Sequence, residues 1–142
     1  MSETGQGVAT EIRNAVGWLR FDRPPVNAFT REMVSAGADL QEFVDIGEAG
    51  MRRWGSSCHA IARLLRRSPK PLLAAINGTA VGGGLEMTLH CDLRFAGESA
   101  RLGQPEIKIA FIPPIATTQA LVRLIGRPRT IRYLYDGALH EA

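Results

Sequence analysis

The feature that most constrains the fold of this chain is a short apolar run, residues 71–76, which is soon followed by three consecutive glycines, residues 82–84. An apolar run of this length, bounded by turn residues, is typical of a strand that is covered on both faces. Asn77-Gly78 predicts a turn, and we expect a helix from the glycines to about His90. Strand, turn and helix in this order indicate an α/β layer fold.

Other patterns extend this arrangement along the chain. Two short strands are expected at 8–12 and 16–21, with a turn at Arg13-Asn14-Ala15 between them. Apolar residues at steps of four, three and four predict a helix over 51–67. These residues are Trp54, Cys58, Ile61 and Leu65. The remaining expected elements are the start of a helix at 28–34, a strand at 93–96, and helices at 117–125 and 129–135.

The bulk composition indicates a single soluble domain, residues 1–142. Its 142 residues are 45% hydrophobic and 22% charged, which is ordinary for a globular protein. No stretch approaches the roughly eighteen apolar residues of a membrane span. The first residues carry neither the basic nor the apolar region of a secretory signal. We therefore expect a cytoplasmic protein that does not enter a membrane.

Positive charge is concentrated in two segments. The net charge is +3, and arginines gather within 52–70 and 123–132. The first interpretation of these two segments is a solvated helix face, and the second is a site for the phosphates of a nucleotide. Binding of nucleic acid comes third, because no nucleic-acid motif is present. Cys58 and Cys91 lie in apolar patterns and predict buried free thiols. No metal site is expected, because the cysteines and histidines lack ligand spacing.

The glycine segment admits three interpretations. Gly82-Gly83-Gly84-Leu85-Glu86 opens the expected helix, and the first amides of a helix lack an internal acceptor and favour negative charge. Those amides could cradle a phosphate or form an oxyanion hole, or the glycines could serve close packing alone. The patterns GxGxxG and GxxxxGKS/T are absent. In the same way, Asp39 in the loop 35–40 could be only a helix N-cap.

Taken together, these segments resemble the crotonase superfamily, the enoyl-CoA hydratase/isomerase family. SAGADLQEF is similar to the first oxyanion loop of the family, and KPLLAAINGTAVGGGLEMTLHCDLRFAGESARLGQPEIKIA is similar to its signature block. RPPVNA, residues 23–28, resembles an early loop on the CoA side. The resemblance covers most of 18–137. It implies an α/β, crotonase-like (ClpP/crotonase-type) core of layered sheet and helix.

The resemblance also implies a set of site residues. The amides of Ala38 and Gly83 would form the oxyanion hole, and Glu86 and Glu106 would be the catalytic carboxyls. The CoA pocket would be lined by Ala36, Gly37, Asp39 and Leu40. Elementary chemistry agrees with the carboxyl pair, because one ionised and one protonated carboxyl can activate water and deliver a proton to carbon.

Three departures from the family pattern are present. Only seven residues separate Asn27 from Ser35, where the family has a helix and a buried strand, and a parallel crossover needs about a dozen residues or more. The sequence ends at Ala142, where resembling proteins continue into helices that close the acyl pocket and build trimers. We therefore expect an incomplete core with exposed apolar surface. Pro114 stands where glycine is common: it either signals a variant specificity, for cyclic or dienoyl thioesters, or begins the next helix at its first position.

The sequence thus predicts an enzyme that acts on an acyl-CoA thioester, most directly by hydration of a 2-enoyl-CoA. No metal or redox cofactor is implied, because CoA enters as part of the substrate. The expected assembly is a homo-oligomer of the trimer type, without nucleic acid. The alternative is a non-catalytic fragment that binds CoA or assembles with longer relatives.

Overall fold

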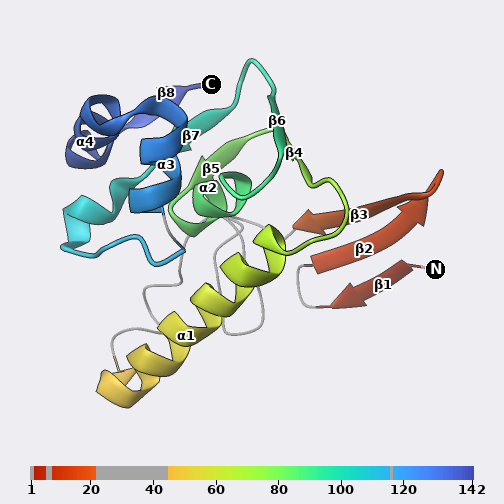
Figure 1. The fold of residues 1–142 in the computed structure, drawn as a ribbon, viewed down its shortest axis with the longest axis horizontal. Helices are drawn as coiled ribbons and strands as arrows, with labels where there is room; N and C mark the ends of the chain where they lie inside the picture. Colours follow the sequence, from red (N-terminus) through yellow and green to blue (C-terminus); the bar gives the residue numbers. More distant parts are fainter. Residues whose placement is uncertain (1, 6–7, 22–44, 116) are drawn as a thin grey trace.

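The computed structural model describes residues 2–5, 8–21, 45–115 and 117–142 (Figure 1). The helix start expected at 28–34 therefore lies outside the described residues. The elements are, in chain order, β1 (Ser2–Gly5), β2 (Val8–Arg13), β3 (Val16–Phe21), α1 (Gly47–Arg66), β4 (Leu73–Ile76), β5 (Thr79–Val81), α2 (Gly83–Thr88), β6 (Leu93–Ala96), β7 (Arg101–Gly103), the 3-10 helix η2 (Pro105–Ile109), α3 (Thr117–Ile125), α4 (Arg127–Asp136) and β8 (Leu139–Glu141).

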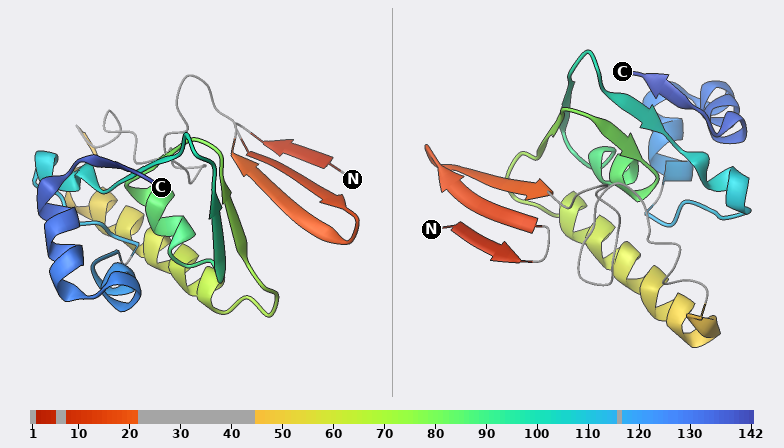
Figure 2. Two further views of the ribbon diagram at one scale, coloured as in Figure 1. Left: turned by 90° about the horizontal axis from the view of Figure 1, so that it is seen from above. Right: turned by 180° about the vertical axis from the view of Figure 1, so that it is seen from behind.

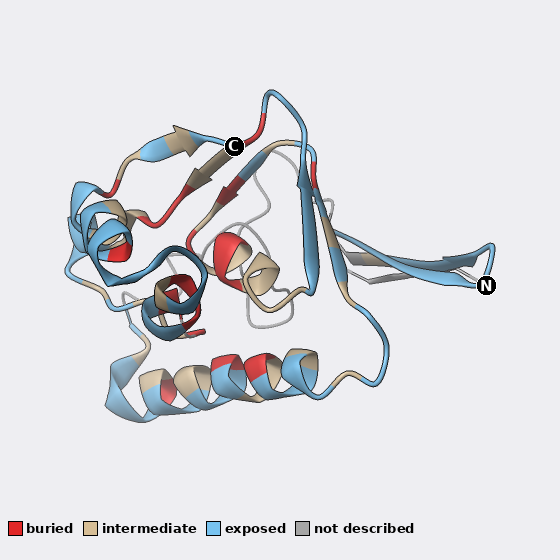
Figure 3. Ribbon diagram, turned by 45° about the horizontal axis from the view of Figure 1, so that its top comes forward, coloured by how far each residue is buried: buried red, intermediate tan, exposed pale blue. Residues whose placement is uncertain are grey.

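The described strands form three small sheets. One is the antiparallel sheet β1-β2-β3, which extends away from the rest of the molecule (Figures 1 and 3). The second is the parallel pair β4-β6. The third has the order β5-β7-β8, in which β5 and β7 are parallel and β8 runs antiparallel to β7 (Figure 2). Parallel strands joined through helices confirm the predicted α/β class.

The N-terminal hairpin matches its prediction closely. Arg13 pairs with Val16, so the turn consists of Asn14 and Ala15. Both turn residues have positive φ, 52° and 62°, as a type I′ turn requires. Asparagine tolerates this backbone well, whereas alanine adopts it at a steric cost.

Helix α1 begins four residues earlier than its apolar pattern predicts. Residues 47–50 contribute no periodic apolar side chain, yet Glu48 forms an ion pair with Arg52 one turn later, at 2.7 Å. The predicted apolar face is confirmed, because Cys58 is buried and the other three members are half-buried. The arginines of α1 are exposed, as a solvated helix face requires. These are Arg52, Arg53, Arg63 and Arg66.

The described core consists of two small clusters on either side of α2. In the first, Cys58 and Ala62 of α1 pack with Ile115. In the second, Ile76 and Ala80 pack with Ala100. Figure 3 shows α2 between α1 and the strands, with its buried residues at the centre of the molecule. The largest fully buried side chains are polar, and they are Gln104, Glu86, Thr117 and Thr130.

The expectation that 71–76 forms a strand covered on both faces is half wrong. β4 is present, and Ile76 is buried, but Leu73 is 60% exposed. The parallel register places Leu73 beside Leu93 of β6, which is 54% exposed, and Phe95 two residues on is 60% exposed. Side chains alternate between the two faces of a strand, so one face of this pair carries the exposed apolar residues. The expected exposed apolar surface is confirmed for the described residues.

The predicted elements in the second half of the chain are largely confirmed. The strand β6 and the helix α3 have the predicted bounds, and α4 is longer than predicted by two residues at its start and one at its end. Helix α2 ends at Thr88, before the predicted His90. The three-residue strands β5, β7 and β8 were not predicted, because so few residues leave no periodic pattern.

Candidate active site

The turn from β5 into α2 places Glu86 at the centre of the molecule. Gly82 has φ 53°, a left-handed conformation that favours glycine, and its amide donates to the carbonyl of Gly103 at 3.0 Å. Gly83 is the first residue of α2, so its amide is one of those without an acceptor inside the helix. Glu86 lies in the first turn of α2, as predicted, and its exposed fraction is 0%.

Glu86 is held by backbone amides from the entry of α3. Its Oε1 accepts hydrogen bonds from the amides of Ile115, at 2.9 Å, and Thr117, at 3.0 Å. Thr117 begins α3, so the carboxyl lies at the positive end of this helix. Burial raises the pKa of Glu86, and the two amides act in the opposite direction because they stabilise the carboxylate. The site therefore holds the Glu86 carboxylate in one fixed orientation.

Glu106 has a different environment. It lies in the first turn of η2, and Gln104, 1% exposed, donates from Nε2 to Glu106 Oε1 at 2.9 Å. Burial raises the pKa of Glu106 to about 7, and the negative charge of Glu86 raises it further in the same direction, against its own backbone amide and Gln104. The structure thus brings the two predicted carboxyls into electrostatic contact. One of them can keep a proton near neutral pH while the other is ionised.

Cys58 forms the α1 side of this site. Burial raises the pKa of its thiol to about 12, and the charge of Glu86 adds to the shift. Cys58 is a buried free thiol, as predicted, while Cys91 is also free but only half-buried. Cys58 thus stays protonated and places an uncharged thiol near Glu86.

Four buried side-chain oxygen atoms of this site have no hydrogen-bond partner among the described residues. They are Oε2 of Glu86, Oε2 of Glu106, Oε1 of Gln104 and Oγ1 of Thr117. Buried polar atoms are nearly always bonded in folded proteins, so each exception needs an explanation, and a catalytic role is one such explanation. Each carboxyl therefore has one oxygen bonded by the protein and one that no described residue bonds.

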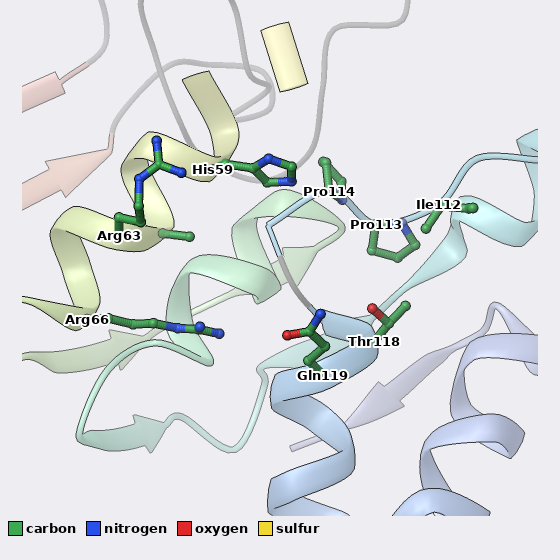
Figure 4. A pocket seen from close by; sticks show the side chains of 9 residues that line it. His59, Arg63, Arg66, Ile112, Pro113, Pro114, Thr118 and Gln119 are labelled. Atoms are coloured by element: carbon green, nitrogen blue, oxygen red, sulfur yellow. The ribbon is translucent and has the colours of Figure 1, made fainter. Parts of the chain in front are cut away.

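A pocket of about 370 Å³ lies between α1 and the loop that leads into α3 (Figure 4). Figure 4 shows the α1 side chains on one side of the pocket and the proline loop with the first turn of α3 on the other. The lining residues are His59, Ala62, Arg63, Arg66, Ile112, Pro113, Pro114, Thr118 and Gln119. Of the predicted site residues that the structure describes, Gly83, Glu86 and Glu106 do not line this pocket, but Pro114, which does, directly precedes the residue that binds Glu86.

The remaining predictions have mixed outcomes. Ala36, Gly37, Ala38, Asp39 and Leu40 lie outside the described residues, so the oxyanion and CoA-pocket assignments stay predictions. Pro114 does not begin the next helix, because α3 starts three residues later, at Thr117. Pro114 lies in a turn instead, and this interpretation was wrong.

Sequence reasoning did not single out Gln104 or His90 for the site. The position of Gln104, two residues before Glu106 in Gln104-Pro105-Glu106, was a sequence signal that could have placed it in the site. His90 bonds a backbone carbonyl 25 residues away in the chain, a relationship that leaves no signal in the sequence. Within the described ranges, no three His, Cys, Asp or Glu side chains are grouped to hold a metal ion. None of the helices in those ranges has the length and apolar character needed to cross a membrane.

Comparisons with known proteins define the class. Residues 32–142 match the family model "Enoyl-CoA hydratase/isomerase". The crystal structure of an enoyl-CoA hydratase from Thermoplasma volcanium GSS1 superposes with a TM-score of 0.91 at 26% identity, covering 97% of this chain and 67% of that chain. The chain therefore has a crotonase-type fold.

Two curated relatives narrow the assignment. YngF of Bacillus subtilis (strain 168) is 47% identical over 110 residues, which are 75% of this chain and 42% of YngF. The crotonyl-CoA hydratase of Syntrophomonas wolfei is 37% identical over 107 residues, which are 75% of this chain and 41% of that enzyme. The chain belongs to the enoyl-CoA hydratase/isomerase family. It spans less than half the length of these two relatives.

Proposed function

We propose that this chain processes acyl-CoA thioesters by reversible addition of water to a 2-enoyl-CoA. The observation that carries the proposal is a pair of carboxyls that affect each other's ionisation, each with one oxygen bonded by the protein. Burial raises the pKa of both carboxyls, that of Glu106 to about 7, and two backbone amides act on Glu86 in the opposite direction, in favour of its carboxylate. Family membership and the crotonyl-CoA hydratase relative support the choice of substrate class.

In this proposal each carboxyl has one role. The Glu86 carboxylate takes a proton from water, whose oxygen bonds to C3 of the enoyl group, while protonated Glu106 gives its proton to C2. The proton then passes from Glu86 back to Glu106 before the next turnover. The negative charge that develops on the thioester oxygen would be stabilised by the amides of Gly83 and Ala38.

The test is an assay of the purified protein with crotonyl-CoA, followed by loss of enoyl absorbance. Replacing either carboxyl by an amide, Glu86→Gln or Glu106→Gln, should lower kcat by about 10²–10⁴-fold, the range for a lost general acid or base. The exposed Glu98→Gln is the matched control and should retain full activity. Unchanged activity in both site variants would show that the carboxyl pair is not catalytic.

The second candidate function is a non-catalytic one, binding of CoA or assembly with longer relatives. The exposed apolar face of β4 and β6, with Leu73, Leu93 and Phe95, favours it because such a face is usually covered. CoA binding by calorimetry without turnover of crotonyl-CoA or a dienoyl-CoA would support this alternative. Turnover of the dienoyl substrate alone would support the variant specificity suggested by Pro114.

A further inference from the structure

His90 forms two hydrogen bonds that fix its tautomer. Its Nε2 lies 2.7 Å from the carbonyl oxygen of Ile115, and Arg66 Nε lies 3.3 Å from its Nδ1. A carbonyl can only accept, so Nε2 must carry the hydrogen; a guanidinium can only donate, so Nδ1 must be the acceptor. Only the neutral imidazole with hydrogen on Nε2 satisfies both bonds. Burial lowers the pKa of His90, the bond to the Ile115 carbonyl opposes this shift, and the charge of Arg66 adds to it; the net lowering agrees with a neutral ring.

The residue that His90 holds is also the residue that binds Glu86. The Ile115 carbonyl accepts from His90, and its amide donates to Glu86 Oε1 at 2.9 Å. The Ile115 side chain is 2% exposed and packs against Cys58 and Ala62. Ile115 is thus fixed at its amide, its carbonyl and its side chain.

We propose that His90 is a positioning residue for Glu86. By holding the carbonyl of Ile115 through Nε2–H, it orients the loop whose amides, from Ile115 and Thr117, bind Oε1 of the carboxylate. Two aligned amides favour the ionised carboxylate in a fully buried place. The catalytic importance of this link rests on the function proposed above, but the link itself can be measured without turnover.

Two variants of nearly equal polarity separate positioning from simple packing. In His90→Gln the side-chain NH₂ can reach the Ile115 carbonyl and the amide oxygen can accept from Arg66. In His90→Asn the side chain is shorter by one carbon and does not reach the carbonyl. His59→Leu, which replaces an exposed histidine of α1, is the control for loss of an imidazole.

The measurements are NMR of the full chain and steady-state kinetics. Long-range ¹H–¹⁵N spectra of the imidazole should show hydrogen on Nε2 in the wild type. A ¹³C titration of the Glu86 carboxyl should give a pKa about one unit higher in His90→Asn, a tenfold change in the ionisation constant. His90→Gln and His59→Leu should leave it nearly unchanged. The kcat should fall about tenfold in His90→Asn with little change in KM, and His90→Gln should restore it.

The outcomes separate the two proposals. If wild-type protein turns over no enoyl-CoA but His90→Asn still shifts the Glu86 titration, the proposed function fails and the positioning role stands. If Glu86 titrates identically in His90→Asn and wild type, or if the imidazole carries its hydrogen on Nδ1, the positioning role is overturned. Equal kinetic losses in His90→Asn and His90→Gln, parallel to a loss of thermal stability, would also overturn it.

Discussion

Gln104 Nε2 donates a hydrogen bond to Glu106 Oε1 over 2.9 Å, and both side chains belong to the segment that leads from β7 into η2. The amide therefore stabilises the ionised form of a carboxyl whose pKa burial has raised to about 7. The pKa of Glu106 thus depends on a hydrogen bond from Gln104, a side chain that stays uncharged at every pH.

Gln104→Leu should raise the pKa of Glu106 above about 7, by roughly half a unit to one unit, because the bond that favours the carboxylate is lost. If protonated Glu106 delivers the proton to carbon, the alkaline limb of the kcat/KM profile should move to higher pH by the same amount. Rates from pH 5 to pH 10 measure this shift. Gln119→Leu, an exposed position on α3, is the control. A profile identical to wild type would show that Gln104 does not tune Glu106.

The stability of the protein should depend on pH through Glu106. Its folded pKa, about 7, exceeds the ordinary value of 4.5, so the folded state binds more protons than the unfolded state between these values. The stabilisation is fully present below about pH 4.5 and is lost as the pH rises through about 7. Urea unfolding between pH 5 and pH 8 should show this decline, and Glu106→Gln should reduce its slope; the rest of the slope belongs to Glu86, whose pKa burial also raises. An equal slope in both proteins would contradict the assigned shift.

Cys58 should be almost inert towards thiol reagents in the folded protein. A pKa of about 12, against the ordinary 9.0, lowers the thiolate fraction at pH 8 by roughly a thousandfold, and burial limits access further. In a Cys91→Ser background, labelling of Cys58 should therefore follow global unfolding and accelerate in urea. Cys58→Ser with Cys91 retained is the matched comparison. If Cys58 is labelled as fast in the folded protein as in urea, reagent reaches the α1 side of the site and Cys58 is not buried there.

Ala15→Gly should stabilise the N-terminal hairpin. Ala15 has φ 62°, which costs an L-residue with a Cβ roughly 1 kcal/mol, and glycine removes this cost. Slower hydrogen exchange of the β2 and β3 amides is the expected result. Ala9→Gly, at the second residue of β2, which pairs with both β1 and β3, should do the opposite, because glycine weakens a regular strand. Faster exchange in Ala15→Gly would show that the turn adopts another form.

Much of the local structure was predictable because it depends on near neighbours. The apolar spacing of α1, the turn at Asn14 and the strand β6 all follow from side chains within one element. The start of α1 was missed because Glu48 and Gly50 contribute no apolar period. The exposed face of β4 was missed because an apolar strand carries no mark of which face is covered.

The sequence by itself determined the glycine turn, the position of Glu86 in the first turn of α2, and the membership of the chain in its family. These follow from local backbone chemistry and from a long signature block. Only the tertiary structure decided how the carboxyls differ. Glu86 and Glu106 are the same residue type, twenty positions apart, and their neighbours in the sequence do not reveal which distant groups each carboxyl meets. Their difference arises because the entry of α3 supplies two amides to Glu86, while Glu106 has a glutamine and a neighbouring negative charge. The fold alone supplies the two amides at Glu86 and the Glu86 charge near Glu106, so the cost of ionising each carboxyl depends on the tertiary structure.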